Sequence, residues 1–163
     1  MTEYISLLSN TAIIEIEQWL TKFPKEQRRS AVIPALMVVQ KENRGYLTEP
    51  LIAAVADYLQ IPKIAAMEVA SFYSMFELRP VGKHKICVCT NISCMLCGSK
   101  SVVAHLQEKL GIGFDQTTPD GMFSLKEVEC LAACDGAPAM QIGEKYYDNL
   151  TPDKIDVILE GLK

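Results

Sequence analysis

The sequence predicts an α/β protein in which a bundle of helices precedes a small domain of mixed strands and helices. Apolar residues recur at helical spacing as far as Arg79, whereas after Gly82 shorter runs follow the spacing of strands. All six cysteines lie in the second part. We therefore place the boundary at this change of period, and we expect residues 1–80 to form the helical bundle and residues 81–163 the second domain.

Four helices are expected in the first part. The first begins at a capping residue, Asn10 or Thr11, and the second contains Pro34, either in its first turn or at a kink. The third opens at Thr48, and the fourth follows Pro62. Because the connections are short, we expect a four-helix bundle.

Three aromatic residues, Phe72, Tyr73 and Phe76, lie near the end of the fourth predicted helix. Aromatic side chains are common both in protein cores and in partner-binding surfaces. We expect Phe72 to belong to the core, and for Tyr73 the two interpretations remain open.

In the second part, the spacing of apolar residues and turn residues predicts a short sheet covered by helices, with the order strand, helix, strand, hairpin, helix. A turn at Gly143-Glu144 separates the two strands of the hairpin, and Thr151 can cap the last helix. The expected strands are Lys85–Thr90, Phe123–Val128, Ala139–Ile142 and Lys145–Asp148, and the expected first helix is Ser99–Leu110.

Composition excludes several classes of function. The net charge of −4 over 163 residues gives no electrostatic reason to expect a nucleic acid partner. No apolar run approaches the ~18 residues of a membrane span, so we expect no direct membrane insertion. The first ten residues, MTEYISLLSN, lack the features of a signal or transit peptide. We expect a soluble bacterial protein of the cytoplasm.

The cysteines are clustered, which in a reducing compartment indicates metal binding or redox chemistry rather than disulfides. Cys89 and Cys94 follow the first predicted strand, and Cys130 and Cys134 follow the second. Four thiolates from two such loops can complete the coordination of both irons of one [2Fe–2S] cluster. These four residues are our expected ligands.

Two other interpretations use some of the same residues. The spacing of a plant-type ferredoxin is matched by Cys89, Cys94 and Cys97 together with Cys130. This choice of ligands leaves Cys134 without a role. A zinc site could use Cys94, Cys97, Cys130 and Cys134, although the second pair has three intervening residues where a zinc ribbon has two. Such a site would define a zinc-stabilised interaction module with no redox role.

Several segments together resemble a known family, the small thioredoxin-like [2Fe–2S] subunit (24 kDa type) of the NADH dehydrogenase module of respiratory complex I. The similarity covers nearly the whole chain. The matching segments are residues 35–47, 69–76 (VASFYSMF), 86–98 (which begins ICVC and ends CMLCG), 118–123 (TPDGMF) and 130–138 (CLAACDGAP).

The resemblance implies a thioredoxin-like [2Fe–2S] ferredoxin domain after the helical bundle, with Cys89, Cys94, Cys130 and Cys134 as cluster ligands. No ligand role transfers to Cys87 or Cys97. It further implies an electron-transfer subunit of NADH:quinone oxidoreductase, with FMN and NADH on a larger partner subunit of the 51 kDa type. No G-x-G-x-x-G or G-x-x-x-x-G-K motif is present, so we do not expect the isolated chain to oxidise NADH.

By the same resemblance, the chain is expected on the cytoplasmic side of the inner membrane, held peripherally as part of a complex. The equivalent subunit of an NAD-linked hydrogenase or formate dehydrogenase is the alternative, because it meets the same flavin partner.

Overall fold

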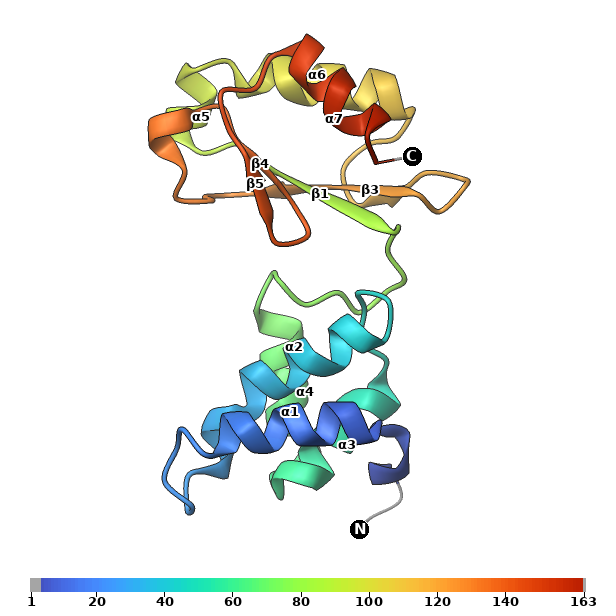
Figure 1. Ribbon diagram of the computed structural model, residues 1–163, viewed down its shortest axis with the longest axis vertical. Helices are drawn as coiled ribbons and strands as arrows, with labels where there is room; N and C mark the ends of the chain where they lie inside the picture. Colours follow the sequence, from blue (N-terminus) through green and yellow to red (C-terminus); the bar gives the residue numbers. More distant parts are fainter. Residues whose placement is uncertain (1–3, 163) are drawn as a thin grey trace. The chain divides into compact units, whose positions relative to one another are not determined.

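The computed structural model describes residues 4–162, and the chain divides into two compact units, Met1–Pro80 and Val81–Lys163 (Figure 1). Each unit has a hydrophobic core of its own. Among the described residues, no helix has both the length and the apolar character needed to cross a membrane.

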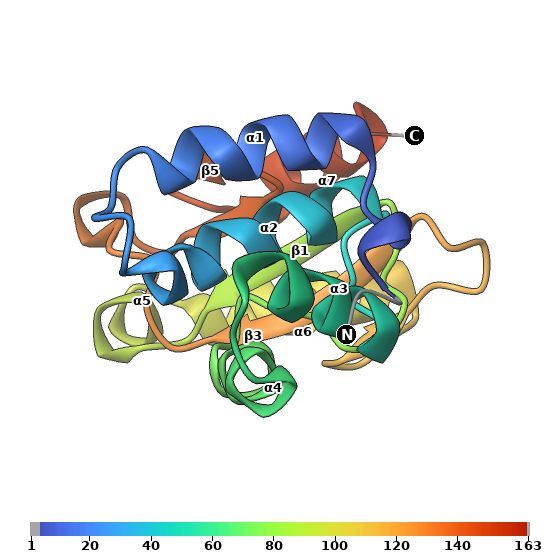
Figure 2. The ribbon, with the colours of Figure 1, turned by 90° about the horizontal axis from the view of Figure 1, so that it is seen from below.

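The first unit, as described from residue 4 onward, contains helices and no strands. Helix α1 packs against α2, and α3 packs against α4 (Figures 1 and 2). Buried aliphatic and alanine side chains from all four helices meet in one core, in which Ile16, Leu36 and Ile52 are almost completely enclosed. The α-helices are α1 (Asn10–Leu20), α2 (Val32–Glu42), α3 (Glu49–Leu59) and α4 (Lys63–Phe72).

Local chemistry explains where these helices begin. The Ser9 hydroxyl accepts a hydrogen bond from the Ala12 N–H at 2.9 Å, so the cap of α1 is Ser9 and neither of the predicted residues, Asn10 and Thr11. Thr48 caps α3 as predicted. Pro34 lies in the first turn of α2, where its missing N–H costs no intrahelical hydrogen bond, so the helix needs no kink there.

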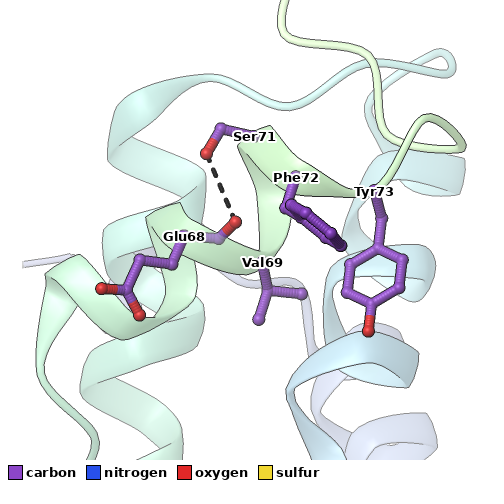
Figure 3. Close-up of a pocket in the computed structure, with 5 residues that line it drawn as sticks. All are labelled: Glu68, Val69, Ser71, Phe72 and Tyr73. Atoms are coloured by element: carbon purple, nitrogen blue, oxygen red, sulfur yellow. Dashed lines mark hydrogen bonds between the residues drawn. The ribbon is translucent and has the colours of Figure 1, made fainter.

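The aromatic residues after α4 correct one prediction. Phe72 is 81% exposed, so its assignment to the core was wrong, whereas Phe76 is 5% exposed and does belong to the core. Figure 3 shows Phe72 and Tyr73 beside a surface pocket, with their rings edge to face at 5.2 Å. Phe72 is the last residue of α4, and its side chain lies on the face of the helix that points away from the core.

The second unit is a five-stranded sheet with the strand order β2-β3-β1-β4-β5. β1 and β3 are parallel, and the other neighbouring pairs are antiparallel. The strands are β1 (His84–Cys89), β2 (Gln116–Thr117), β3 (Phe123–Val128), β4 (Met140–Ile142) and β5 (Lys145–Tyr147). The helices are α5 (Ile92–Leu96), α6 (Ser99–Leu110) and α7 (Pro152–Glu160).

Helices α6 and α7 lie on the same side of this sheet (Figure 1). Ile86 of β1 aligns with Leu125 of β3 and with Ile142 of β4, and these side chains form the core beneath Leu106 of α6 and Ile155 of α7. The α/β class of the prediction is confirmed, with the helices packed on the short sheet as expected.

An ionic contact joins α6 to α7. The Asp156 carboxylate lies 2.8 Å from His105 Nε2 and 3.0 Å from Lys109 Nζ. The hydrogen bond from His105 and then that from Lys109 lower the pKa of Asp156 below its ordinary value. Because the folded protein favours the charged carboxylate, this contact contributes stability above the pKa of an unfolded Asp, about 3.9, and loses it as the pH falls through the lower folded value.

We therefore expect Asp156→Asn to increase amide hydrogen exchange in α6 and α7 slightly at pH 7, and the difference from the unmodified protein to shrink as the pH approaches 3. Exchange is the suitable measurement because the single tryptophan, Trp19, lies in the first unit. Glu160→Gln, at the exposed end of α7, is the control and should leave exchange unchanged. A pH-independent effect of Asp156→Asn would contradict the ionic explanation.

Candidate metal centre

The parallel pairing of β1 and β3 brings the two cysteine loops to the same edge of the sheet. The last residues of the strands, Cys89 and Val128, are register partners, and the Thr90 N–H donates to the Val128 carbonyl at 3.1 Å. Since the carboxyl ends of parallel strands meet at one edge, the loop after β1 and the loop after β3 start side by side. Figure 1 shows α5 and the loop after β3 at this same end.

The first loop buries its two predicted ligands. Cys89 and Cys94 are each 2% exposed, and they pack with Ala139 in a small cluster separate from the main core of the unit. The Cys89 N–H donates to the Ala139 carbonyl at 3.1 Å, which anchors the end of β1 to the segment before β4. This pair therefore lies beneath the protein surface, shielded from water.

Cys94 is placed by α5, a short helix where a loop was expected. Asn91 precedes it as the N-cap residue, and its side-chain oxygen accepts a hydrogen bond from the Ile92 N–H at 2.7 Å. Of the described residues 92–96, Cys94 alone is buried. An asparagine directly before the helix was the available signal for it, but a helix of five residues is too short for a periodic apolar pattern.

The thiol of Cys94 interacts with two other predicted ligands. Burial raises the pKa of Cys94, and the hydrogen bond with Cys89, together with negative charge on Cys89 and Cys134, raises it further. A backbone hydrogen bond at Ala139 acts in the opposite direction. Cys89 and Cys134 thus lie close enough to Cys94 to oppose its ionisation, and a bound cation would relieve this repulsion by replacing the proton.

The second loop keeps its two cysteines at the surface. Cys130 and Cys134 are both exposed, and the Ala132 N–H lies 3.3 Å from the Cys130 sulfur. Ala132 has a positive φ of 55°, a conformation uncommon for residues other than glycine, and the chain turns there beside this sulfur. An N–H group in this position stabilises a thiolate and influences the reduction potential of a metal cluster bound to it.

A close backbone contact supports the loop after Cys134. Residues Cys134–Gly136 form a 3₁₀ turn, and the Gly136 carbonyl accepts a hydrogen bond of 2.6 Å from the Asn149 N–H. A Cβ atom on Gly136 would lie 2.5 Å from the Cβ of Asp148. Only glycine allows the two segments to approach so closely, and the segment after β5 therefore fixes the position of the Cys134 turn.

The remaining two cysteines are arranged differently. Cys87 is half-buried in the middle of β1, where it aligns with Lys126 and Gln141 on the neighbouring strands. Cys97 is exposed at the end of α5, directly before Gly98. Cys87 is a strand residue away from the loops, whereas Cys97 lies at the cysteine edge beside the predicted ligands.

The donor set of the two loops is chemically suited to a [2Fe–2S] cluster. Among residues 4–162, no three His, Cys, Asp or Glu side chains are arranged to hold one metal ion. A [2Fe–2S] cluster makes a different demand, since each of its two irons takes two of the four thiolates. Two cysteine pairs from loops that start at the same sheet edge meet this demand in number and in ligand softness.

Comparison with known proteins gives the class of this fold and site. The family model described as thioredoxin-like [2Fe–2S] ferredoxin matches residues 16–163. The chain belongs to the thioredoxin-like [2Fe–2S] ferredoxin family, and the resemblance seen in the sequence is confirmed.

Two individual relatives with high sequence identity are E subunits of NADH-quinone oxidoreductase. The chain is 44% identical over 149 residues to the second E subunit of this enzyme from Rhizobium meliloti (strain 1021), covering 91% of this chain and 87% of that protein. It is 46% identical over 147 residues to the E subunit from Rickettsia bellii (strain RML369-C), covering 90% and 88%.

Among solved structures, NAD⁺-reducing [NiFe]-hydrogenase in the H₂-reduced state has a TM-score of 0.68 at 23% identity. The match covers 79% of this chain and 22% of that chain. At this identity the likeness is evidence for the fold alone.

Proposed function

We propose that this chain is the electron-transfer subunit of an NADH:quinone oxidoreductase of the respiratory chain. In this proposal it carries one [2Fe–2S] cluster on Cys89, Cys94, Cys130 and Cys134, near the flavin of a partner subunit. The observation that carries the proposal is the pairing of the two cysteine loops at one sheet edge, in a chain 44–46% identical to proteins named as the E subunit of this enzyme. When bound, the cluster accepts and returns single electrons.

The four cysteines would hold the cluster from two different environments, one buried and one at the surface. Cys89 and Cys94 supply buried sulfurs from which water is excluded, and Cys130 and Cys134 supply sulfurs near the surface, where a redox partner can approach. The Ala132 N–H offers a hydrogen bond to one sulfur. Helix α6 begins two residues after Cys97, so its N-terminal N–H groups belong to the same edge and favour an anionic group there.

The partner in this proposal is the larger subunit of the 51 kDa type that binds FMN and NADH. The pair would lie peripherally on the cytoplasmic side of the bacterial inner membrane as part of the complex. The hydride chemistry belongs to the partner, and this chain supplies the ligands, the burial and the contact surface for single electrons. On its own it should not oxidise NADH.

The first test is to purify the chain anaerobically and determine its iron and acid-labile sulfide. About two of each per chain, with visible charge-transfer absorption, is expected for one [2Fe–2S] cluster. A colourless protein with stoichiometric zinc would overturn the proposal.

The second test is to co-express the chain with the flavin-binding subunit from the neighbouring gene. The pair should co-purify, and NADH should reduce a soluble acceptor with the pair but not with this chain alone. Genes for membrane subunits in the neighbourhood support the quinone-reducing complex. A hydrogenase or formate dehydrogenase large subunit in their place would assign the chain to that alternative.

A further inference from the structure

Helix α7 has a lysine in its first turn, where the chemistry of a helix disfavours a cation. The Lys154 N–H donates to the Thr151 hydroxyl at 3.2 Å as part of the helix cap. Because the N-terminal end of a helix carries partial positive charge, a lysine side chain does not stabilise it. The Lys154 ammonium turns back beyond the helix, where it donates to the Asp148 carbonyl and lies 3.4 Å from Asp148 Oδ1. The position of this lysine therefore needs a reason other than helix stability.

The Asp148 carboxylate lies against the turn that carries Cys134. A Cβ atom on Gly136 would lie 2.9 Å from Asp148 Oδ2, so the carboxylate takes the space that a side chain at this position would need. The hydrogen bond from the Asn149 N–H to the Gly136 carbonyl, at 2.6 Å, fixes this close approach. The fold thus holds a negative charge beside a residue that follows Cys134 by only two positions.

The second cysteine loop has no positive charge of its own. Glu127, Glu129 and Asp135 are exposed in or beside it, and no lysine, arginine or histidine occurs from position 127 to position 144. Four thiolates make a bound cluster anionic, and one-electron reduction adds a further negative charge, which nearby carboxylates oppose. Lys154, which comes from a different segment of the chain, supplies a cation on this side of the site.

We propose that Lys154 and Asp148 form a charge pair that sets the reduction potential of the cluster. In this inference, which rests on the proposed function and deepens it, Lys154 neutralises the Asp148 carboxylate beside the Cys134 turn. The potential is thereby higher than that carboxylate alone would allow. Both side chains lie outside the ligand set, so they act as positioned charges. A fixed charge near a redox group changes the relative energies of its two charge states, as it does for an ionisable group.

The exposure of the pair separates this role from a structural one. The Lys154 and Asp148 side chains are 42% and 60% exposed, and exposed ion pairs contribute little to stability. Charges at a surface still act on each other within a screening length of roughly 8 Å at physiological ionic strength. Lys109, in the last turn of α6, lies roughly 15 Å along the helix from Ser99, which is at the cysteine edge. A charge at Lys109 is therefore screened from the site.

The test is a reductive titration of the anaerobically purified, cluster-loaded chain, with redox mediators and the visible absorption of the cluster as the readout. Lys154→Met removes the cation and should shift the midpoint potential to more negative values. Asp148→Asn removes the carboxylate and should shift it to more positive values. The double variant should return close to the unmodified potential, and Lys154→Arg, which keeps the charge, should leave it unchanged. The shifts should shrink as the salt concentration rises.

The matched controls are Lys109→Met and Glu160→Gln, which remove one exposed cation and one exposed carboxylate away from the cysteine loops. Neither should change the potential. If Lys154→Met and Asp148→Asn shift the potential in the same direction and their effects add in the double variant, the substitutions act by distorting the site, and the inference is wrong. Equal shifts in the controls would also reject it.

The outcomes distinguish this inference from the proposed function. If the unmodified chain holds a [2Fe–2S] cluster whose potential none of the variants changes, the inference fails and the proposed function stands. If the unmodified chain holds no such cluster, the proposed function fails and the inference fails with it. If Lys154→Met loses its cluster during purification, Asp148→Asn and Lys154→Arg still decide the question, because a positive shift is required of the first and no shift of the second.

Discussion

Replacing Cys134 by serine is expected to abolish stable binding of the cluster. Serine keeps the size of the side chain but offers a hard hydroxyl in place of the soft thiolate that iron requires. Cys134 is exposed, and its negative charge contributes to the raised pKa of the buried Cys94. We expect iron and acid-labile sulfide in the purified variant to fall from about two per chain toward zero, with loss of the visible absorption.

The matched control is Cys97→Ser. Cys97 is exposed at the end of α5, and our ligand set does not use it. The variant should keep a full cluster with an unchanged spectrum. The reverse result, with Cys97 required and Cys134 dispensable, would establish the plant-type ligand set and reject ours.

Replacing Gly136 by alanine is expected to have the second-largest effect. The added methyl group would lie 2.5 Å from the Cβ of Asp148, which cannot rotate away, so the Cys134 turn or the segment after β5 must shift. Overpacking of this kind typically costs about 1–3 kcal/mol. We expect reduced stability of the second unit and faster loss of the cluster, measured as decay of visible absorption in the presence of an iron chelator.

Gly113→Ala is the control for this substitution. A Cβ there would lie 3.5 Å from the Gln116 side chain, which is an ordinary contact. Its chelator decay should match that of the unmodified protein. If Gly136→Ala also decays at the unmodified rate, the contact between the Cys134 turn and the segment after β5 is not needed to retain the cluster.

Much of the secondary structure could be predicted from the sequence, because local chemistry decides many of the ends. The Thr48 and Thr151 caps, the helix from Ser99 to Leu110 and the strand Phe123–Val128 are confirmed. In each case a capping residue, a glycine or a turn lies beside a clear apolar pattern. That the four helices of the first unit form a bundle stays a prediction.

Three features that the sequence did not predict were missed for physical reasons. Helix α5 and strand β2 are five and two residues long, too short to carry a period, and β2 exists only because Gln116 and Thr117 pair with β3. The exposure of Phe72 was missed because an aromatic residue at the end of an amphipathic helix looks like a core residue until the path of the chain is known.

The residues of the candidate site could be predicted from the sequence, but their arrangement in space could not. Spacing alone identified the cysteine-rich loops, yet it allowed either Cys97 or Cys134 as the fourth ligand. The parallel register of Cys89 with Val128, which depends on a pairing formed across the whole α6 connection, brings both loops to one edge, but Cys97 lies at that edge too, so the register does not choose between Cys97 and Cys134. The four-cysteine set is still a prediction until the substitutions are made.

The parallel pairing of β1 and β3 also determines when a cluster can be inserted. Cys89 and Cys130 approach each other only after α6 has crossed over and β3 has added to the sheet, which is slow compared with local helix formation because distant segments must meet. During synthesis, the first cysteine loop leaves the ribosome long before the second exists as a partner. A cluster held by all four cysteines would therefore require β1 and β3 to pair, so that complete coordination and the fold of the second unit depend on each other.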